Sequence, residues 1–270
     1  PDATDRAEVV DLEDAAVADS YNSQAILAYY RGDWPRVERL FSRALEIRER
    51  VLGPDHPDVA QTLNNLGLLH QAQDAYARAV PLYTRAAAIW EKALGPDHAR
   101  LALVLNNLGL AYQEQGDLES AAPLFERALA IREAALGPDN PDVAQTLYNL
   151  ANLQRDRGDL AAARPLYRRA LAIREASLGP DHADVGWTIT ARAGLDAAAG
   201  DLEQAIAGMT RGLAILEAAL GGDFPELAEE HERLAGYLRR ADRPQEAAAR
   251  ERRADAIRSR ASAAGDAASR

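Results

Sequence analysis

Residues 52–71 read LGPDHPDVAQTLNNLGLLHQ, and this stretch decides the fold because close copies of its first nine residues recur along the chain. The copies begin at Leu94 (LGPDHARLA), Leu136 (LGPDNPDVA), Leu178 (LGPDHADVG) and Leu220 (LGGDFPELA), each 42 residues after the last. Residues 136–177 match residues 52–93 at 24 of 42 positions. A fixed period of this size indicates a repeat architecture, in which one structural unit is copied along the chain.

Each unit is predicted to contain two amphipathic helices. Apolar residues recur every three or four positions in 59–69 and again in 76–89, with a short break between the two runs. Gly-Asp pairs occupy that break at 32–33, 116–117, 158–159 and 200–201, where Gly ends the first helix and Asp begins the second. Gly-Pro pairs at 53–54, 95–96, 137–138 and 179–180 end the second helix, and we expect the Asp after each Pro to cap the next first helix.

Small and large side chains alternate at fixed places in the repeat. The small residues of the first helices, where helices are expected to touch, are Ala25, Gly67, Gly109, Ala151, Ala193 and Ala235. The large residues of the second helices, expected in the core, are Phe41, Tyr83, Phe125, Tyr167 and Met209. With the strings TLNNLGLLH, VPLYTRAAAIWE and LGPDHPDVA, this pattern resembles a tetratricopeptide repeat of the 42-residue, kinesin-light-chain-like type over residues 18–258.

The resemblance implies an all-α fold, a right-handed α-solenoid of about six helix pairs. The long coiled coil of kinesin light chains is absent from the chain, so only the repeat architecture is carried over. We expect an acidic N-terminal segment (1–17), a repeat array with a C-terminal capping helix (18–260) and a flexible tail (261–270). The chain starts at Pro1 without an apolar leader, so we expect it to begin inside a longer or processed polypeptide. Its bias toward Arg and Ala suggests a bacterial source.

Composition excludes several classes of function. A net charge of −11 argues against nucleic-acid binding, and the absence of Cys excludes disulfides and thiolate sites. No apolar run approaches the roughly 20 residues of a membrane span, so we expect a soluble, cytoplasmic monomer. The basic stretch 239–260, with eight Arg against four acids, is interpreted as a solvated terminal helix with internal salt bridges rather than a phosphate site.

Catalytic and metal sites are not predicted. The chain has no GxSxG, Walker, HExxH or dinucleotide motif, so we expect no enzyme activity and no cofactor. His56, His98 and His182 stand one or more periods apart, too far to share a metal ion, and are expected to serve as turn and cap residues. The repeated glutamates and arginines of the second helices are interpreted as surface charge pairs. They are Glu49, Glu91, Glu133, Glu175 and Glu217 beside Arg48, Arg132 and Arg174.

The resemblance places a binding groove along the first helices, because in tetratricopeptide arrays these helices line the concave face. The predicted groove residues are Gln61, Asn64, Leu68, Gln71, Leu103, Asn106, Leu110, Gln113, Gln145, Tyr148, Asn152, Arg155 and Trp187. Amide side chains both donate and accept, so Asn64 and Asn106 suit the backbone of an extended peptide. The neighbouring Asn65, Asn107 and Asn149 suit either ligand contact or hydrogen bonds between helices.

The three tryptophans receive separate interpretations. Trp187 breaks the pattern of its column and is either a groove anchor or, slightly favoured, a packing residue near the irregular Arg192. Trp34 is expected to be structural. Trp90 replaces the Arg of its column and is interpreted as marking a contact on the outer face.

Two functions remain in view, and both take a protein or peptide as partner. One is a peptide-binding adaptor that uses the groove. The other is a sensor or scaffold arm of a longer bacterial effector or signalling protein. Self-assembly through the array ends is less favoured, because the last helix, roughly 245–260, has the polar face of a terminal cap.

Overall fold

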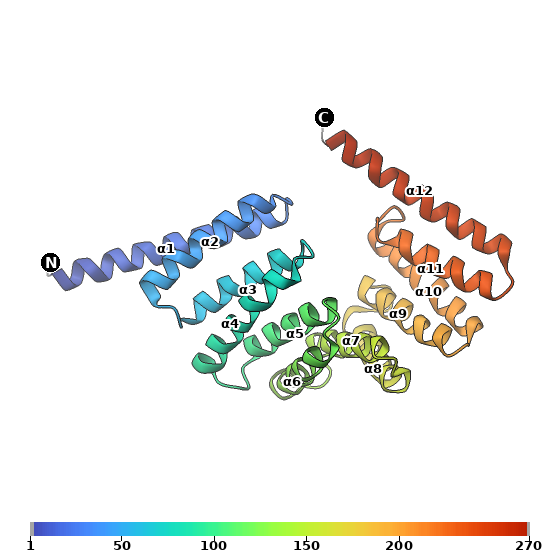
Figure 1. The fold of residues 1–270 in the computed structure, drawn as a ribbon, viewed down its shortest axis with the longest axis horizontal. Coiled ribbons are helices and arrows are strands. Elements are labelled where there is room, and N and C mark those ends of the chain that lie inside the picture. Colours follow the sequence, from blue (N-terminus) through green and yellow to red (C-terminus); the bar gives the residue numbers. More distant parts are fainter. Residues whose placement is uncertain (1–2, 269–270) are drawn as a thin grey trace. The chain divides into compact units, whose positions relative to one another are not determined.

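The computed structural model describes residues 3–268, with side chains described for 14–263, and in this range it consists of helices joined by short turns, with no strand (Figure 1). The twelve helices of the described residues are α1 (Ala3–Tyr29), α2 (Trp34–Leu52), α3 (Pro57–Gln71), α4 (Tyr76–Leu94), α5 (Ala99–Glu114), α6 (Leu118–Leu136), α7 (Pro141–Asp156), α8 (Leu160–Leu178), α9 (Ala183–Ala198), α10 (Leu202–Leu220), α11 (Leu227–Arg240) and α12 (Pro244–Ala268). The predicted all-α solenoid of helix pairs is confirmed, while its right-handed sense stays a prediction.

The chain divides into two compact units, residues 1–138 (unit 1, α1–α6) and 139–270 (unit 2, α7–α12). Within each unit the odd-numbered helix of a pair packs on the helix that follows it, and that second helix packs on the next pair. Helices α1 and α12 run past the boundaries expected at residues 18 and 260, since α1 begins at Ala3 and α12 continues to Ala268. The proposed division into segment, array and tail stays a prediction.

The second helices begin as the sequence predicts. Asp33, Asp117, Asp159 and Asp201 each accept a hydrogen bond at the side chain from the backbone N–H three residues later. The Gly before each Asp has a φ between 71° and 87°, the left-handed conformation that ends the first helix. The hydrogen bonds from Ser120 lower the pKa of the Asp117 carboxyl, as expected for a cap that accepts in its charged form.

The first helices begin one residue later than we expected. Their caps are His56, His98, Asn140 and His182, whose side chains accept from the backbone N–H two residues on. The prediction that the preceding Asp caps these helices is therefore wrong. Residues 53–56 form a turn in which the His56 N–H donates to the Gly53 carbonyl at 3.3 Å, and helix α3 begins directly after this turn at Pro57. The cap role expected for the three histidines is confirmed.

The core of each pair depends on a small residue facing a large one. A Cβ atom placed on Gly67 lies 2.4 Å from Cε1 of Tyr83, and one on Gly109 lies 2.9 Å from Cε1 of Phe125. Both aromatic residues are fully buried, so neither has room to withdraw. The fourth repeat (α7 and α8) has the same arrangement, with Ala151 and Tyr167 in one buried cluster.

We therefore expect Gly109→Leu to lower the free energy of unfolding by about 2 to 3 kcal/mol, the range of severe overpacking, because Phe125 leaves no space for the new side chain. Gly236→Ala is the matched control. Its Cβ meets nothing within 4 Å and it lies inside α11, so it should stabilise the fold by about 0.5 to 1 kcal/mol. Denaturant unfolding of the two variants measures both values, and equal stability would contradict this packing.

The second repeat (α3 and α4) starts its second helix without the Gly-Asp pair. Asp74 stands where four other repeats have Gly and is held at φ 55°, as is Asp242 at φ 57° in the last repeat, and Ala75 stands at the cap position with no side-chain hydrogen bond. We predict that Ala75→Asp raises the free energy of unfolding by about 1 kcal/mol by supplying the missing cap. The reverse change in the next repeat, Asp117→Ala, should lower it by a similar amount. Thermal and denaturant melts decide this, and no gain from Ala75→Asp would show that α4 has another N-terminal restraint.

Candidate functional site

The arginine column of the second helices is buried rather than on the surface. Arg48 on α2 donates to Thr62 Oγ1 (2.7 Å) and the Asp58 carbonyl (2.9 Å) of α3, and to Asp19 Oδ1 (2.6 Å) of α1. It thus connects three helices while being only 7% exposed. Our prediction of surface pairing is wrong for these arginines, because the long side chain reaches inward to the first turn of the next helix.

Unit 2 repeats this connection. Arg174 on α8 donates to Thr188 Oγ1 (2.7 Å) and the Asp184 carbonyl (3.2 Å) of α9, and to Gln145 Oε1 (2.7 Å) of α7. Its guanidinium also lies 4.8 Å from the centre of the Tyr148 ring. Burial lowers the pKa of Arg174, against the opposing effect of Asp184, but an Arg starts from so high a pKa that it stays charged at neutral pH. Arg132 is buried in the same way.

Glutamates of the neighbouring column, one residue after each arginine, do form surface pairs. Glu49 bonds Arg85 at 2.6 Å, Glu91 bonds Arg127 at 2.6 Å, and Glu175 bonds Arg211 at 3.0 Å. Each pair joins two successive second helices on their solvent side, so the prediction is confirmed for these three glutamates. Glu217 differs, because it bonds the buried His231 of α11 at 3.2 Å. Among the described residues no group of three His, Asp or Glu is arranged to hold a metal ion.

Trp90 lies in the core, and the prediction of an outer-face contact is wrong. It is 2% exposed, belongs to the cluster of α3, α4 and α5, and donates through Nε1 to the Pro57 carbonyl at 3.1 Å. The indole thus occupies the buried place that an arginine holds in other repeats. Trp34 is structural as expected, with its ring 5.2 Å from that of Tyr29 in an edge arrangement.

Most of the predicted groove amides are engaged inside the protein. Asn107 of α5 donates to Asn64 Oδ1 of α3 at 3.1 Å, and Asn65 of α3 donates to Asn22 Oδ1 of α1 at the same distance. Asn64 is only 4% exposed as a result. Gln71 accepts from the Tyr83 hydroxyl at 2.9 Å. Asn106 is buried and Gln113 half-buried, each with an interaction of its own.

The predicted residues of unit 2 form a similar internal network. Gln145 bonds Arg174 and also donates to Asn149 Oδ1 at 3.1 Å. The Tyr167 hydroxyl donates to Asn152 Oδ1 and lies 3.5 Å from a guanidinium nitrogen of Arg155, whose main partner is Asp156. Tyr148 packs edge-on to Tyr167, with ring centres 5.9 Å apart.

Trp187 is half-buried against the cluster formed by α9 to α12, which agrees with the packing role that we favoured.

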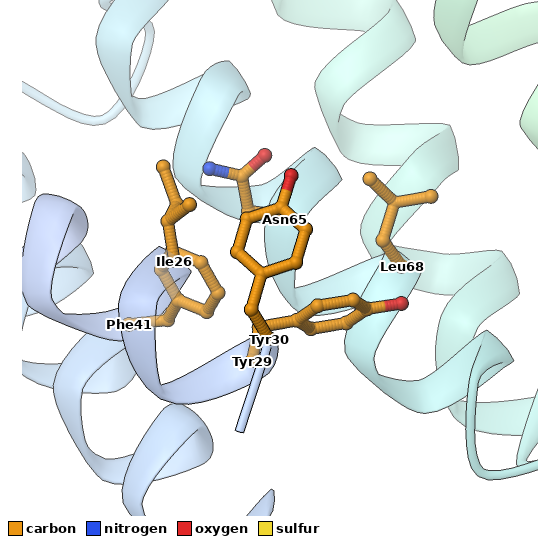
Figure 2. A pocket seen from close by; sticks show the side chains of 6 residues that line it. All are labelled: Ile26, Tyr29, Tyr30, Phe41, Asn65 and Leu68. Atoms are coloured by element: carbon orange, nitrogen blue, oxygen red, sulfur yellow. The ribbon is translucent and has the colours of Figure 1, made fainter. Parts of the chain in front are cut away.

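Unit 1 keeps an accessible, uncharged surface on its first helices. Gln61 and Leu103 are exposed, Leu103 at 41%, and Leu68 and Leu110 are half-buried. This surface continues into a cavity of about 210 Å³, which we call the α1–α3 pocket. Its lining residues are Ile26, Tyr29, Tyr30, Phe41, Asn65 and Leu68. Figure 2 shows Ile26 and Phe41 on one side of the two tyrosine rings and Leu68 on the other.

We did not predict Ile26, Tyr29 or Tyr30, although the period points to two of them. Ile26 lies 42 residues before Leu68, and Tyr29 lies 42 before Gln71. Extending the groove columns back by one repeat finds both. Tyr30, which is 83% exposed at the end of α1, carries no such signal. In the part of the chain that the structure describes, no helix is both long and apolar enough to cross a bilayer.

Comparisons with known proteins agree with this geometry. The family model described as "Tetratricopeptide repeat" matches residues 16–92, 59–134, 101–176 and 142–218. The fold is similar to BtubC (BKLC) from P. vanneervenii, with a TM-score of 0.67, 21% identity, and coverage of 93% of this chain and 92% of that one. No curated protein matches the sequence.

Two further solved structures share the fold. A putative kinesin light chain from Podosopora anserina with nearly identical TPR-like repeats has a TM-score of 0.62 and 23% identity, and the match covers 76% of this chain and 98% of that one. Aspartyl phosphate phosphatase F from Bacillus subtilis has a TM-score of 0.67 and 15% identity, covering 92% and 72%. Identities this low establish the architecture and not the partner.

The buried arginines give a direct test of how the repeats are held together. We expect Arg174→Met to lower the free energy of unfolding by about 3 kcal/mol, because it leaves Thr188, Gln145 and a carbonyl without their charged donor. Arg211→Met removes an arginine from an exposed pair and should cost less than about 1 kcal/mol. Denaturant unfolding compares the two, and equal costs would mean that the buried connection adds nothing beyond surface pairing.

Proposed function

Because the chain belongs to the tetratricopeptide repeat family, whose repeats serve protein–protein interaction, we propose that it binds an extended segment of another protein along the first helices of unit 1. The binding surface would consist of the accessible face of α1, α3 and α5, with the α1–α3 pocket as its anchor point. The observation that carries this proposal is that pocket, an open and mostly apolar cavity in an accessible surface without unpaired charges.

The period shows that this surface differs between the units. Ile26, Leu68 and Leu110 occupy one column in unit 1, each 42 residues from the next. In unit 2 the same column holds Asn152, Gly194 and Gly236. A residue needed for helix packing would be apolar in every repeat, whereas this column is apolar only on α1, α3 and α5. Such a localised apolar patch is typical of an interaction site.

The charge of the surface restricts the partner. In the groove columns of unit 1 the one ionised side chain is Asp19, and it is bonded to Arg48 at 2.6 Å. The whole chain is acidic, which disfavours a strongly acidic partner. We therefore expect a segment with one bulky apolar side chain for the pocket and few acidic residues around it. The exposed amide of Gln61 is available to bond the partner's backbone.

The predicted groove residues Asn64, Asn106, Asn152 and Arg155 would then act mainly as supports, holding the first helices at the spacing that the bound segment needs. The other role that we considered, a sensor or scaffold arm of a longer protein, stays a prediction. The same surface would serve the interaction in that case.

Selection of peptides on the intact chain from a random phage-displayed library tests this proposal. We expect the selected sequences to share a Leu, Met or aromatic residue, and Ile26→Asp to weaken a synthetic consensus peptide by at least about tenfold, because the new charge faces an apolar cavity. Tyr30→Ala, which truncates a side chain that is 83% exposed and so spares the fold, should weaken the peptide in the same direction. Titration calorimetry gives the affinities.

The matched control is Ala88→Asp, which adds the same charge at an exposed position of α4, on a second helix. It should change the affinity by less than about twofold, because exposed charges far from a site are screened. Circular dichroism confirms that each variant is folded. Peptides that bind the Ile26 and Tyr30 variants as tightly as the parent would exclude the pocket as the binding site.

A further inference from the structure

A second cavity, in unit 2, is lined almost entirely by charged side chains. It has a volume of about 350 Å³ and lies between α8, α9 and the N-terminus of α10. Its lining residues are Arg164, Arg168, Arg192, Asp196, Asp201 and Gln204. Three arginine and two aspartate side chains therefore line one cavity on a chain whose net charge is −11.

Both carboxylates are already engaged. Asp196 accepts from Arg164 at 2.7 Å, and its side chain is only 13% exposed. Asp201 accepts from the backbone N–H of Gln204 at 3.1 Å as the cap of α10. Within the described residues, neither Arg168 nor Arg192 has a hydrogen bond or an ion pair, so two positive charges line the cavity without a protein partner.

Arg192 also departs from the rule of its column. The same position holds Leu66, Leu108, Leu150 and Leu234, each at most 6% exposed, in four other repeats, and the exposed Gln24 in the first. An arginine at this half-buried site gives up apolar packing that the four leucines keep. Arg164 is unusual as well, since its column otherwise holds Glu38, Val80, Ala122, Ile206 and Ala248. Each of these two columns holds an arginine only once, and both arginines line the same cavity. Departures from a repeat pattern that meet at one place are expected at functional sites.

We propose that this cavity binds a phosphate group, with Arg168 and Arg192 as its principal ligands. The lining carries three guanidinium groups and two carboxylates, a net charge of +1, which a phosphate monoester with a charge of about −1.5 to −2 at pH 7 would offset. The planar N–H donors of a guanidinium group fit the oxygen atoms of a phosphate. A phosphate can accept from both Arg168 and Arg192, whereas a single carboxylate needs only one of them. The Arg164–Asp196 pair and the Asp201 cap of α10 complete the lining.

The test uses the intact chain and two probes, inorganic phosphate and a short phosphoserine peptide, with the arginine Nε–H signals observed by NMR. We expect both probes to shift the signals of Arg168 and Arg192, and added sodium chloride to weaken binding. Tighter binding of the peptide would identify a phosphorylated protein as the source of the group. Tighter binding of inorganic phosphate would identify a small phosphate compound.

Two variants and a control separate this site from general attraction to positive charge. Arg192→Leu installs the residue of the other repeats, so it should fold well and still weaken phosphate binding by at least about tenfold. Arg168→Gln, at an exposed position, should act in the same direction. Arg100→Gln removes the same charge from an exposed site on α5 in unit 1 and should change binding by less than about twofold. Absence of any shift, or equal binding by all three variants, would overturn the proposal.

Discussion

Close contact between a small residue of each first helix and a large residue of its second helix is the constraint on which the rest of the structure depends. Gly67 against Tyr83 and Gly109 against Phe125 leave no space even for a methyl group. The contact brings the two helices of a pair together, and the repeated pair then presents one first helix beside the next. Equivalent residues recur after 42 positions, so they form columns across successive helices, and this spacing sets the distance between neighbours in each column.

Polar residues secure this arrangement from inside. The buried guanidiniums of Arg48 and Arg174 each join three helices, and the asparagine pairs Asn22–Asn65 and Asn64–Asn107 join successive first helices of unit 1. Each is satisfied by partners on neighbouring repeats, so the buried charges and amides fix the register between repeats. Repeat two shows that the scheme tolerates exchange, since Trp90 fills an arginine position with apolar contacts and one hydrogen bond.

The sequence predicts the fold almost completely, because a period of 42, Gly-Asp breaks and alternating small and large residues are local signals that reinforce one another. It predicts the candidate site less well. Whether Asn64 faces a ligand or another helix depends on where Asn107 points, which only the packed structure reveals. The burial of Arg48 was missed for a similar reason, since a long side chain on a helix edge can turn to solvent or inward. The α1–α3 pocket needs residues from three helices, among them Tyr30, which obeys no repeat pattern.

The residues that pack the helices recur in the repeats, whereas residues that differ between repeats are candidates for binding. Among these, the apolar surface of α1, α3 and α5 is where we propose that the partner binds. Site-directed photo-crosslinking tests this claim most directly. A benzophenone amino acid in place of Tyr30, at the edge of the pocket, should cross-link to the selected peptide, while the same amino acid in place of Ala88 on α4 should not. Cross-linking at residue 88 with none at residue 30 would contradict the account, since it would put the partner on the second helices.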